Sequence, residues 1–229
     1  MWIDDQVISE CQKAFTLKAW VPDKPMVVLG RSNQIEECHA ELARQDHIEV
    51  LQRYGGGGAV VLYPGSLVVS IGTWVKDRFQ NDFYFRKLNQ ALIELLANQY
   101  PQLATKLSQN GISDITLQAD SEKKIAGTSL FRSRNYLLYQ ASILVTPDIA
   151  LISKYLPHPS KEPKYRGERD HRSFLTSLSE AEPTITSAEL CAKLLDLGPE
   201  FFMKELDGEL IEVQSSQCPH LLKKIGVPE

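Results

Sequence analysis

Four consecutive glycines, Gly55 to Gly58, lie between two short apolar runs, and this feature restricts the fold more than any other in the sequence. The runs at residues 48–51 and 59–62 have the length of buried strands, so the glycines are predicted to form a loop between two strands. Glycine has no Cβ, so such a loop can adopt dihedral angles closed to other residues, and a ligand can approach its backbone closely. Successive N–H groups can then hold an anion. The loop alone is equally compatible with a flexible hairpin.

The remaining pattern predicts a mixture of strands and helices. Predicted strands are residues 26–29, 67–71, 115–117 and 136–145, and a polar turn at 118–122 predicts antiparallel pairing of 115–117 with 123–127. Predicted helices are residues 34–46, 83–97 and a segment that opens with the capping pattern Thr186–Glu189 and stops around Gly198-Pro199. The proline- and charge-rich stretch 157–172 is predicted to be a long, mobile surface loop, and residues from Gln214 onward a tail.

Size and composition indicate one globular domain, residues 1–229, because 229 residues with 43% apolar side chains can bury a proper core. With 25 basic and 29 acidic residues the net charge is −4, so we expect no nucleic-acid partner. The acidic start does not fit a signal peptide, and the most apolar stretch, residues 59–72, is interrupted by Pro64 and Gly65, so we expect a cytoplasmic protein with no membrane partner. The four cysteines lack paired spacing, and no protein metal site is predicted.

Lys124 and Asp114 are the isolated residues with the clearest chemical potential. Lys124 lies near Gly127 at the edge of an apolar segment, where one fixed positive charge can meet a phosphate or a developing oxyanion. Composition alone favours the alternative that Lys123 and Lys124 are solvated turn residues. Asp114 precedes a predicted strand and suits a metal-binding or ribose-contacting carboxylate as well as a simple turn former.

The order of the motifs decides between these interpretations. Taken together, the motifs resemble those of the lipoate-protein ligase family over about residues 25–180, and the resemblance is to the catalytic domain only. The motifs that resemble the family's are Val27–Gln34 (VVLGRSNQ), Arg53–Val60 (RYGGGGAV), Ser113-Asp114 and Lys124–Ser129 (KIAGTS). The resemblance implies an α+β fold with a mixed, largely antiparallel sheet flanked by helices. That fold is similar to the catalytic domain of biotin-protein ligases and class II aminoacyl-tRNA synthetases.

The resemblance also implies a reaction and a set of roles. ATP, bound with Mg²⁺ as a substrate complex, activates lipoate or octanoate to an acyl-adenylate, and the acyl group passes to a lysine of a lipoyl-acceptor domain in a 2-oxoacid dehydrogenase or glycine-cleavage-type protein. Lys124 matches the family's catalytic lysine. The acyl and phosphate groups are expected at Arg53, Gly55, Gly56, Gly57, Gly58, Ala59 and Gln140, and the nucleotide at Ser113, Asp114 and Gly127. An apolar tunnel must also take the acyl chain; its wall candidates are Val60, Leu62, Val68 and Ile143, although an ordinary core role is the more common one for each of them.

Departures from the family pattern keep two alternatives open. Leu62 and Gln140 stand where ligases typically carry histidines, which favours a catalytically inactive member that acts as a binding protein. Pro64–Val68 (PGSLV) resembles a motif of octanoyltransferases, which favours acyl transfer from an acyl carrier protein, although no cysteine follows the last shared strand. We expect no C-terminal accessory domain, and a separate subunit could supply its function. We also expect little room before residue 25 for the family's preceding strand and helix.

Overall fold

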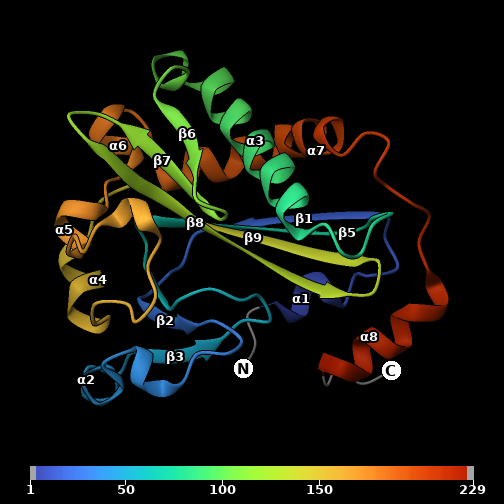
Figure 1. Cartoon of the computed structure of the whole chain (residues 1–229), viewed down its shortest axis with the longest axis horizontal. Coiled ribbons are helices and arrows are strands. Elements are labelled where there is room, and N and C mark those ends of the chain that lie inside the picture. The colour runs from blue at the N-terminus through green and yellow to red at the C-terminus, as the bar shows by residue number, and fades with distance from the viewer. Residues whose placement is uncertain (1–3, 226–229) are drawn as a thin grey trace.

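The computed structural model describes residues 4–225 and contains two sheets with helices around them (Figure 1). The large sheet has the order β1-β5-β9-β8-β7-β6, and every neighbouring pair is antiparallel. Its strands are β1 (Phe15–Trp20), β5 (Ser66–Trp74), β6 (Leu107–Asn110), β7 (Asp114–Gln118), β8 (Glu122–Ser133) and β9 (Tyr136–Leu144). The small sheet consists of β3 (Glu49–Gln52), β2 (Met26–Leu29) and β4 (Val60–Leu62), with β2 parallel to β3 and antiparallel to β4.

The two longest helices lie together on one side of the large sheet. The α-helices are α1 (Asp5–Ile8), α2 (Ala40–Gln45), α3 (Asn81–Gln99), α4 (Ile149–Tyr155), α5 (His171–Phe174), α6 (Leu178–Ala181), α7 (Ser187–Glu205) and α8 (Cys218–Ile225). Figure 1 shows α3 and α7 against one face of the large sheet and the small sheet on the other side. None of the helices within residues 4–225 is long and apolar enough to cross a membrane.

The alternation of side chains along β5 and β9 separates a packed face from a functional face. Successive strand residues point to opposite faces, and the side chains that pack in the α3 and α7 core are Leu67, Val69, Ile71, Tyr139, Ala141 and Ile143. Ser70 pairs with Gln140, and Val68 with Ser142, on the other face. Both faces are covered, so β5 is buried along its whole length, which explains why it reads as a continuous apolar run.

The glycine loop connects the two outer strands of the small sheet. It follows β3 and precedes β4, and these strands lie on opposite sides of β2. The loop between two strands is therefore confirmed, but the hairpin is wrong, because a hairpin needs strands that pair with each other. The predicted antiparallel pairing across the turn at 118–122 is confirmed between β7 and β8.

Two helical predictions need correction, whereas the predicted helix 83–97 lies within α3. Residues 34–46 form a short 3-10 turn, Ile35–Glu37, and a separate α2, because Cys38 is extended and the N–H of His39 donates to the Tyr155 carbonyl. The late helix does not stop at Gly198-Pro199. A Cβ on Gly198 would lie 2.8 Å from Leu17 Cδ1, so this glycine permits close packing of α7 on β1.

Both ends of the chain are more ordered than the sequence indicated. Residues before 25 include α1 and β1, and β1 pairs along its length with β5. The predicted tail contains α8, whose Cys218 and Leu221 are buried against Val7 and Ile8, while residues 226–229 lie outside the described part of the chain. The predicted loop 157–172 carries a 3-10 turn and the start of α5, and hydrogen bonds from Ser160, Tyr165 and Arg169 attach it to the rest of the molecule.

Candidate active site

Lys124 and Asp114 form an ion pair on the functional face of the large sheet. The Lys124 Nζ lies 2.7 Å from Asp114 Oδ1, and the Asp114 side chain is 8% exposed. A register shift between Ile115 and Thr116 aligns Asp114 with Gly127 on β8. A Cβ on Gly127 would lie 3.0 Å from Lys124 Nζ, so the glycine leaves room for the lysine to fold back across the strand. Lys124 therefore lies beside a carboxylate, and it is not the solvated turn residue of the alternative interpretation.

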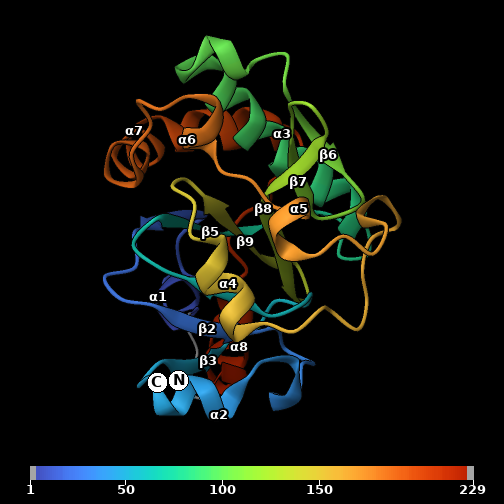
Figure 2. The same cartoon turned by 90° about the vertical axis from the view of Figure 1, so that its left-hand side faces the viewer.

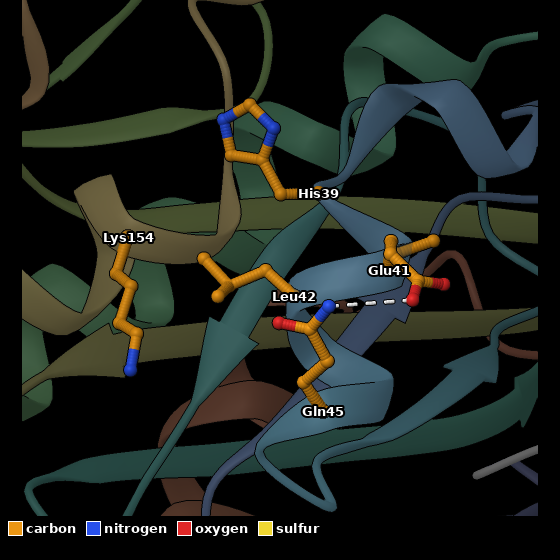
Figure 3. Close-up of a pocket in the computed structure, with 6 residues that line it drawn as sticks. His39, Glu41, Leu42, Gln45 and Lys154 are labelled. Carbon is orange, nitrogen blue, oxygen red and sulfur yellow. Dashed lines mark hydrogen bonds between the residues drawn. The ribbon is translucent and has the colours of Figure 1, made fainter.

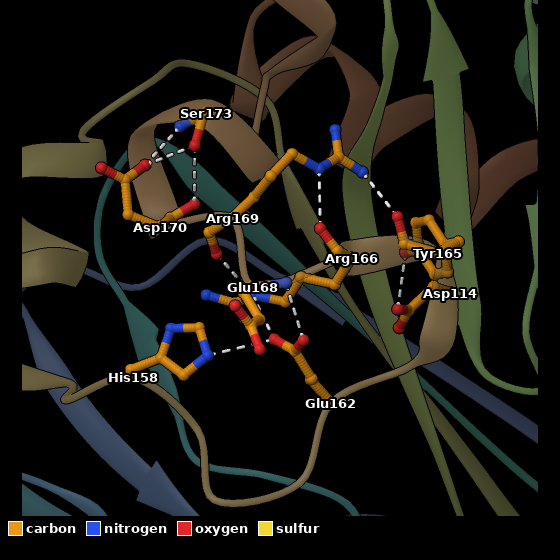
Figure 4. A network of polar contacts seen from close by, with 9 residues as sticks. All are labelled: Asp114, His158, Glu162, Tyr165, Arg166, Glu168, Arg169, Asp170 and Ser173. Atoms are coloured by element: carbon orange, nitrogen blue, oxygen red, sulfur yellow. Dashed lines mark hydrogen bonds and ion pairs between the residues drawn. The ribbon is translucent and has the colours of Figure 1, made fainter.

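The second carboxylate oxygen of Asp114 contacts the segment after α4. Tyr165 donates its hydroxyl to Asp114 Oδ2 at 2.8 Å (Figure 4). Burial, and next the charge of Asp114, raise the pKa of the Tyr165 phenol above its ordinary value. The phenol therefore stays protonated and acts as a donor, so Asp114 is held between Lys124 and Tyr165.

A polar network keeps this segment against the sheet (Figure 4). Arg169 donates to the carbonyls of Tyr165, Arg166 and Glu122, and the Thr176 N–H donates to the Lys124 carbonyl. Figure 2 shows α5 beside β7 and β8. The predicted mobile cover is thus tied to the same strands that carry Asp114 and Lys124.

His171, which begins α5, is a half-buried base close to this network. Burial first, and then the charges of Arg166, His158 and Lys124, lower its pKa to about 4. Asp170, whose carboxylate caps α5, opposes the shift only in part. His171 is therefore uncharged near neutral pH and adds no positive charge beside Lys124.

Arg53 shapes the glycine loop from inside. Its Nη2 donates to the carbonyls of Gly56 at 2.7 Å and Gly58 at 2.8 Å, and its Nη1 reaches the Val28 carbonyl at 3.4 Å. Gly57, between the two accepting carbonyls, has φ = 91°, in the left-handed region that favours glycine. Burial lowers the pKa of Arg53 to about 10, which leaves the guanidinium charged at neutral pH.

A cavity of about 120 Å³ brings most of the predicted site residues together. It lies between the small sheet and the functional face of the large sheet, and Gly55, Gly56 and Ile143 are the named candidates that are not among its walls. The predicted residues that line it are Arg53, Gly57, Gly58, Ala59, Val60, Leu62, Val68, Ser113, Asp114, Lys124, Gly127 and Gln140. Ile143 as an acyl wall is wrong, because it is fully buried on the opposite face with the α3 and α7 core.

Sequence reasoning missed several polar residues of this site. Ser129 and Ser142 line the cavity beside Gln140, and the alternation of side chains along β9 would have identified Ser142. Asp4 is fully buried and accepts hydrogen bonds from the Tyr54 N–H at 2.6 Å and from Gln140 Nε2. Nothing local in the sequence indicates that Asp4 lies beside Gln140, which is 136 positions away.

A second hollow lies away from these residues. It is open, has a volume of about 570 Å³, and lies between α2 and α4 (Figure 3). His39, Leu42 and Lys154 line it, and Gln45 donates to Glu41 at 3.3 Å at its edge. It contains none of the predicted site residues, so the smaller cavity remains the candidate site.

The cysteines do not reach the cavity: none of its wall residues is a cysteine. Cys11, Cys38 and Cys218 are buried and Cys191 is half-buried. Burial raises the pKa of the Cys38 and Cys191 thiols, and burial followed by a hydrogen bond with Cys218 raises that of Cys11 to about 12. These thiols are poor nucleophiles because the thiolate is disfavoured.

A sequence profile of the lipoyl protein ligase A/B catalytic domain matches residues 3–197, which is most of the chain. The chain belongs to this family. The family includes transferases as well as ligases, so membership supports a lipoate-type ligase or transferase and leaves the acyl donor open. The predicted resemblance, made from ordered motifs, is confirmed.

Solved lipoate-protein ligases share the fold. A bi-partite lipoate protein ligase from Thermoplasma acidophilum, described together with its E2 lipoyl domain, matches with a TM-score of 0.71 at 20% identity, covering 96% of this chain and 87% of that chain. A putative lipoate protein ligase from T. acidophilum with bound lipoic acid matches with a TM-score of 0.67 at 20% identity, covering 96% and 89%. Lipoate-protein ligase A bound with ATP matches with a TM-score of 0.68 at 22% identity, covering 96% and 87%. The predicted mixed α+β fold with a large antiparallel sheet is confirmed.

Proposed function

We propose that this chain is a lipoate-protein ligase that uses ATP to activate lipoate or octanoate and transfers the acyl group to a lysine of a lipoyl-acceptor domain. The observation that carries the proposal is the Lys124–Asp114 ion pair, which lies in one cavity with Arg53 and the glycine loop. Solved relatives of the same fold include one with bound lipoic acid and one bound with ATP. The single domain, residues 1–229, remains part of this proposal.

In the first half-reaction, a carboxylate oxygen attacks the α-phosphorus of ATP and pyrophosphate leaves. The two reactants are anions, and Lys124 and Arg53 supply the cationic charge that offsets their repulsion, while magnesium enters with the triphosphate as part of the substrate. Arg53 acts mainly through the loop, because its Nη2 already donates to Gly56 and Gly58. Lys124 is therefore the residue that we assign to the reacting carboxylate and phosphate.

In the second half-reaction, the amine of the acceptor lysine attacks the acyl carbonyl, the C–O bond to phosphate breaks, and AMP leaves as the amide forms. Lys124 polarises the carbonyl in this step. The titratable residues that line the cavity are Arg53, Asp114 and Lys124, since Leu62 and Gln140 occupy the family's histidine positions. The amine must therefore lose its proton without an imidazole from these positions, to the departing phosphate or to solvent.

Nucleotide entry requires the segment after α4 to move. A cavity of about 120 Å³ is smaller than the roughly 300–1,000 Å³ of typical small-molecule sites. Tyr165 occupies the free oxygen of Asp114, which is the carboxylate assigned to nucleotide placement. We propose that the Tyr165–Asp114 hydrogen bond breaks when ATP binds.

The thiols argue against a cysteine acyl-enzyme and hence against the transferase alternative. Ser66, in the transferase-like PGSLV stretch, is also unsuited as a nucleophile: its hydroxyl accepts from the Tyr63 N–H at 3.0 Å and donates to the Tyr63 carbonyl at 2.7 Å. The stretch therefore forms a tight turn into β5. Gly65 belongs to this turn, since a Cβ there would lie 2.8 Å from the Thr146 carbonyl oxygen.

A donor competition tests the proposal. Purified protein is incubated with a lipoyl-acceptor domain and either ATP, magnesium and octanoate or octanoyl carrier protein, each with and without a candidate accessory subunit. Acylation of the acceptor that requires ATP and free acid supports the ligase. Acylation from the carrier protein without ATP would establish the transferase. Binding of the acceptor without acylation from either donor, with or without the added subunit, would establish a binding protein.

A further inference from the structure

Asp4 is a buried carboxylate at the start of α1, outside the motifs that define the site. It has no exposed surface. Its carbonyl accepts from the N–H groups of Val7 and Ile8, and both of these side chains pack in a buried cluster with Trp74. The indole of Trp74 donates to the Cys11 carbonyl at 2.9 Å, which fixes the end of the same segment. Asp4 is therefore held rigidly beneath the glycine loop.

The carboxylate of Asp4 joins the glycine loop to strand β9. Asp4 Oδ2 accepts from the N–H of Tyr54, the residue between Arg53 and Gly55, and Asp4 Oδ1 accepts from Gln140 Nε2. Gln140 Nε2 also lies 3.3 Å from Ser70 Oγ. One side chain thus connects the loop that carries Arg53 with the cavity wall.

The contact with Asp4 determines which way the Gln140 amide points. An ionised carboxylate only accepts hydrogen bonds, so it requires the NH₂ group of Gln140 to face it. The carbonyl oxygen Oε1 then faces the glycine loop, 3.7 Å from the position of a Cβ on Gly55. It has no hydrogen-bond partner among the described residues. Gln140 therefore contributes an acceptor to the wall of the cavity.

The charge of Asp4 also suits its place. Arg53 is the buried cation of the loop, and a buried cation is costly unless an opposite charge lies near it. The Asp4 charge raises the pKa of Arg53 and so opposes the lowering by burial. Asp4 stabilises the charged form of Arg53 while it holds the backbone of the next residue.

We infer that Asp4 is a positioning residue for the acyl site: it fixes the glycine loop at Tyr54 and orients the Gln140 amide so that Oε1 faces the loop. This inference rests on the proposed function for its kinetic consequence. Asp4 does not touch the reacting atoms but acts through Gln140 and the loop. The acyl site is then completed by the N-terminal segment, and α8 covers this segment through contacts with α1.

Three variants test the inference. Asp4→Asn removes the charge and places an NH₂ group opposite the Gln140 NH₂. Gln140→Glu alone places two carboxylates together. The double variant Asp4→Asn/Gln140→Glu exchanges amide and carboxylate, so the donor, both acceptors and the net charge are kept. Glu10→Gln is the matched control, since Glu10 belongs to the same segment and forms partly exposed ion pairs with Lys13 and Lys18.

We expect each single variant to raise the KM for the acyl acid about tenfold to a hundredfold, the effect of one lost hydrogen bond to a charged group, with a much smaller change in kcat. The double variant should recover most of the loss, and Glu10→Gln should match the native protein. A purely local packing role would lower the melting temperature without this KM-specific pattern of loss and recovery. An unchanged KM in Asp4→Asn overturns the inference, and so does a lack of recovery in the double variant. The second criterion still applies where a single variant fails to fold.

A second readout does not depend on the proposed function. In a ¹⁵N-labelled protein, the Gln140 side-chain NH₂ signals, assigned by their loss in Gln140→Glu, should exchange slowly with solvent and should shift and exchange faster in Asp4→Asn. Native protein that shows this behaviour but no acyl transfer would refute the ligase and leave the positioning role supported. A Gln140 signal that is identical in Asp4→Asn refutes the positioning role.

Discussion

Gly55→Ala should destabilise the protein while Gly56→Ala, one position along the same loop, should not. A Cβ on Gly55 would lie 2.4 Å from Ser129 Oγ and 2.9 Å from Ser129 Cβ, and Ser129 is itself buried on β8. A Cβ on Gly56 would meet nothing within 4 Å. The two variants therefore change the same residue type in the same loop and differ only in what the new methyl group contacts.

The magnitudes follow from these contacts. Overpacking at a buried position costs about 1–3 kcal/mol. Gly56→Ala loses nothing in the folded state and gains about 0.4–1 kcal/mol from the restricted unfolded chain. Gly55→Ala has the same gain in the unfolded chain, so we expect the free energies of unfolding of the two variants to differ by about 1–3 kcal/mol, measured by urea denaturation. The acylation kcat/KM should fall only in Gly55→Ala, because the loop that carries Arg53 has to shift.

Ser129→Ala provides the internal control for the mechanism. It removes the atom at 2.4 Å and leaves the Cβ at 2.9 Å, so Gly55→Ala/Ser129→Ala should recover part of the lost stability. Equal stability of Gly55→Ala and Gly56→Ala would refute the reasoning. Full additivity of the Gly55 and Ser129 changes would refute the assigned contact.

Three further results are expected. Tyr165→Phe should lower the free energy of unfolding by about 1.5–3 kcal/mol in urea denaturation, because it removes a hydrogen bond to the Asp114 carboxylate; no change would mean that the bond is not formed. The pKa of His171 is about 4 in the folded protein and about 6.5 in the unfolded chain, so the unfolded chain binds more protons between these values and stability falls as pH drops from 7 towards 4. His171→Gln should reduce the difference in melting temperature between pH 7.5 and pH 5, and an equal difference would contradict the assignment. Leu221→Ala should cost about 2–5 kcal/mol in urea denaturation, since Leu221 is 1% exposed, whereas a cost below about 1 kcal/mol would mean that α8 is not packed.

The sequence was sufficient to predict the order of the site motifs and the strands that carry them. The short apolar runs around the glycines became β3 and β4, and the turn at 118–122 joined β7 to β8. These predictions rest on local signals: a period of two residues in strands and turn-forming residues between them. The motif order then placed Lys124 and Asp114 in one cavity, as the structure confirms.

Contacts between distant segments were beyond such reasoning. Asp4 reaches Gln140 and Tyr165 reaches Asp114, and no local pattern indicates which distant side chain will fill a space. Ile143 was assigned to the wrong face because adjacent strand residues point in opposite directions, and Ser142 is the residue that faces the cavity. Gly198 was interpreted as a helix stop. The contact with Leu17 that explains this glycine depends on tertiary packing, which no local pattern shows.

The central claim is that Lys124 promotes adenylation of a lipoyl-type acid, and isotope exchange between ATP and pyrophosphate tests it most directly. The exchange isolates the first half-reaction and needs no acceptor domain. Lys123→Ala is the matched control, because Lys123 is the adjacent lysine and does not line the cavity. We predict octanoate- or lipoate-dependent exchange in the native protein and in Lys123→Ala, and a loss of at least about a hundredfold in Lys124→Ala. Exchange that persists in Lys124→Ala, or that is absent from the native protein with every accessory subunit tested, would contradict the claim.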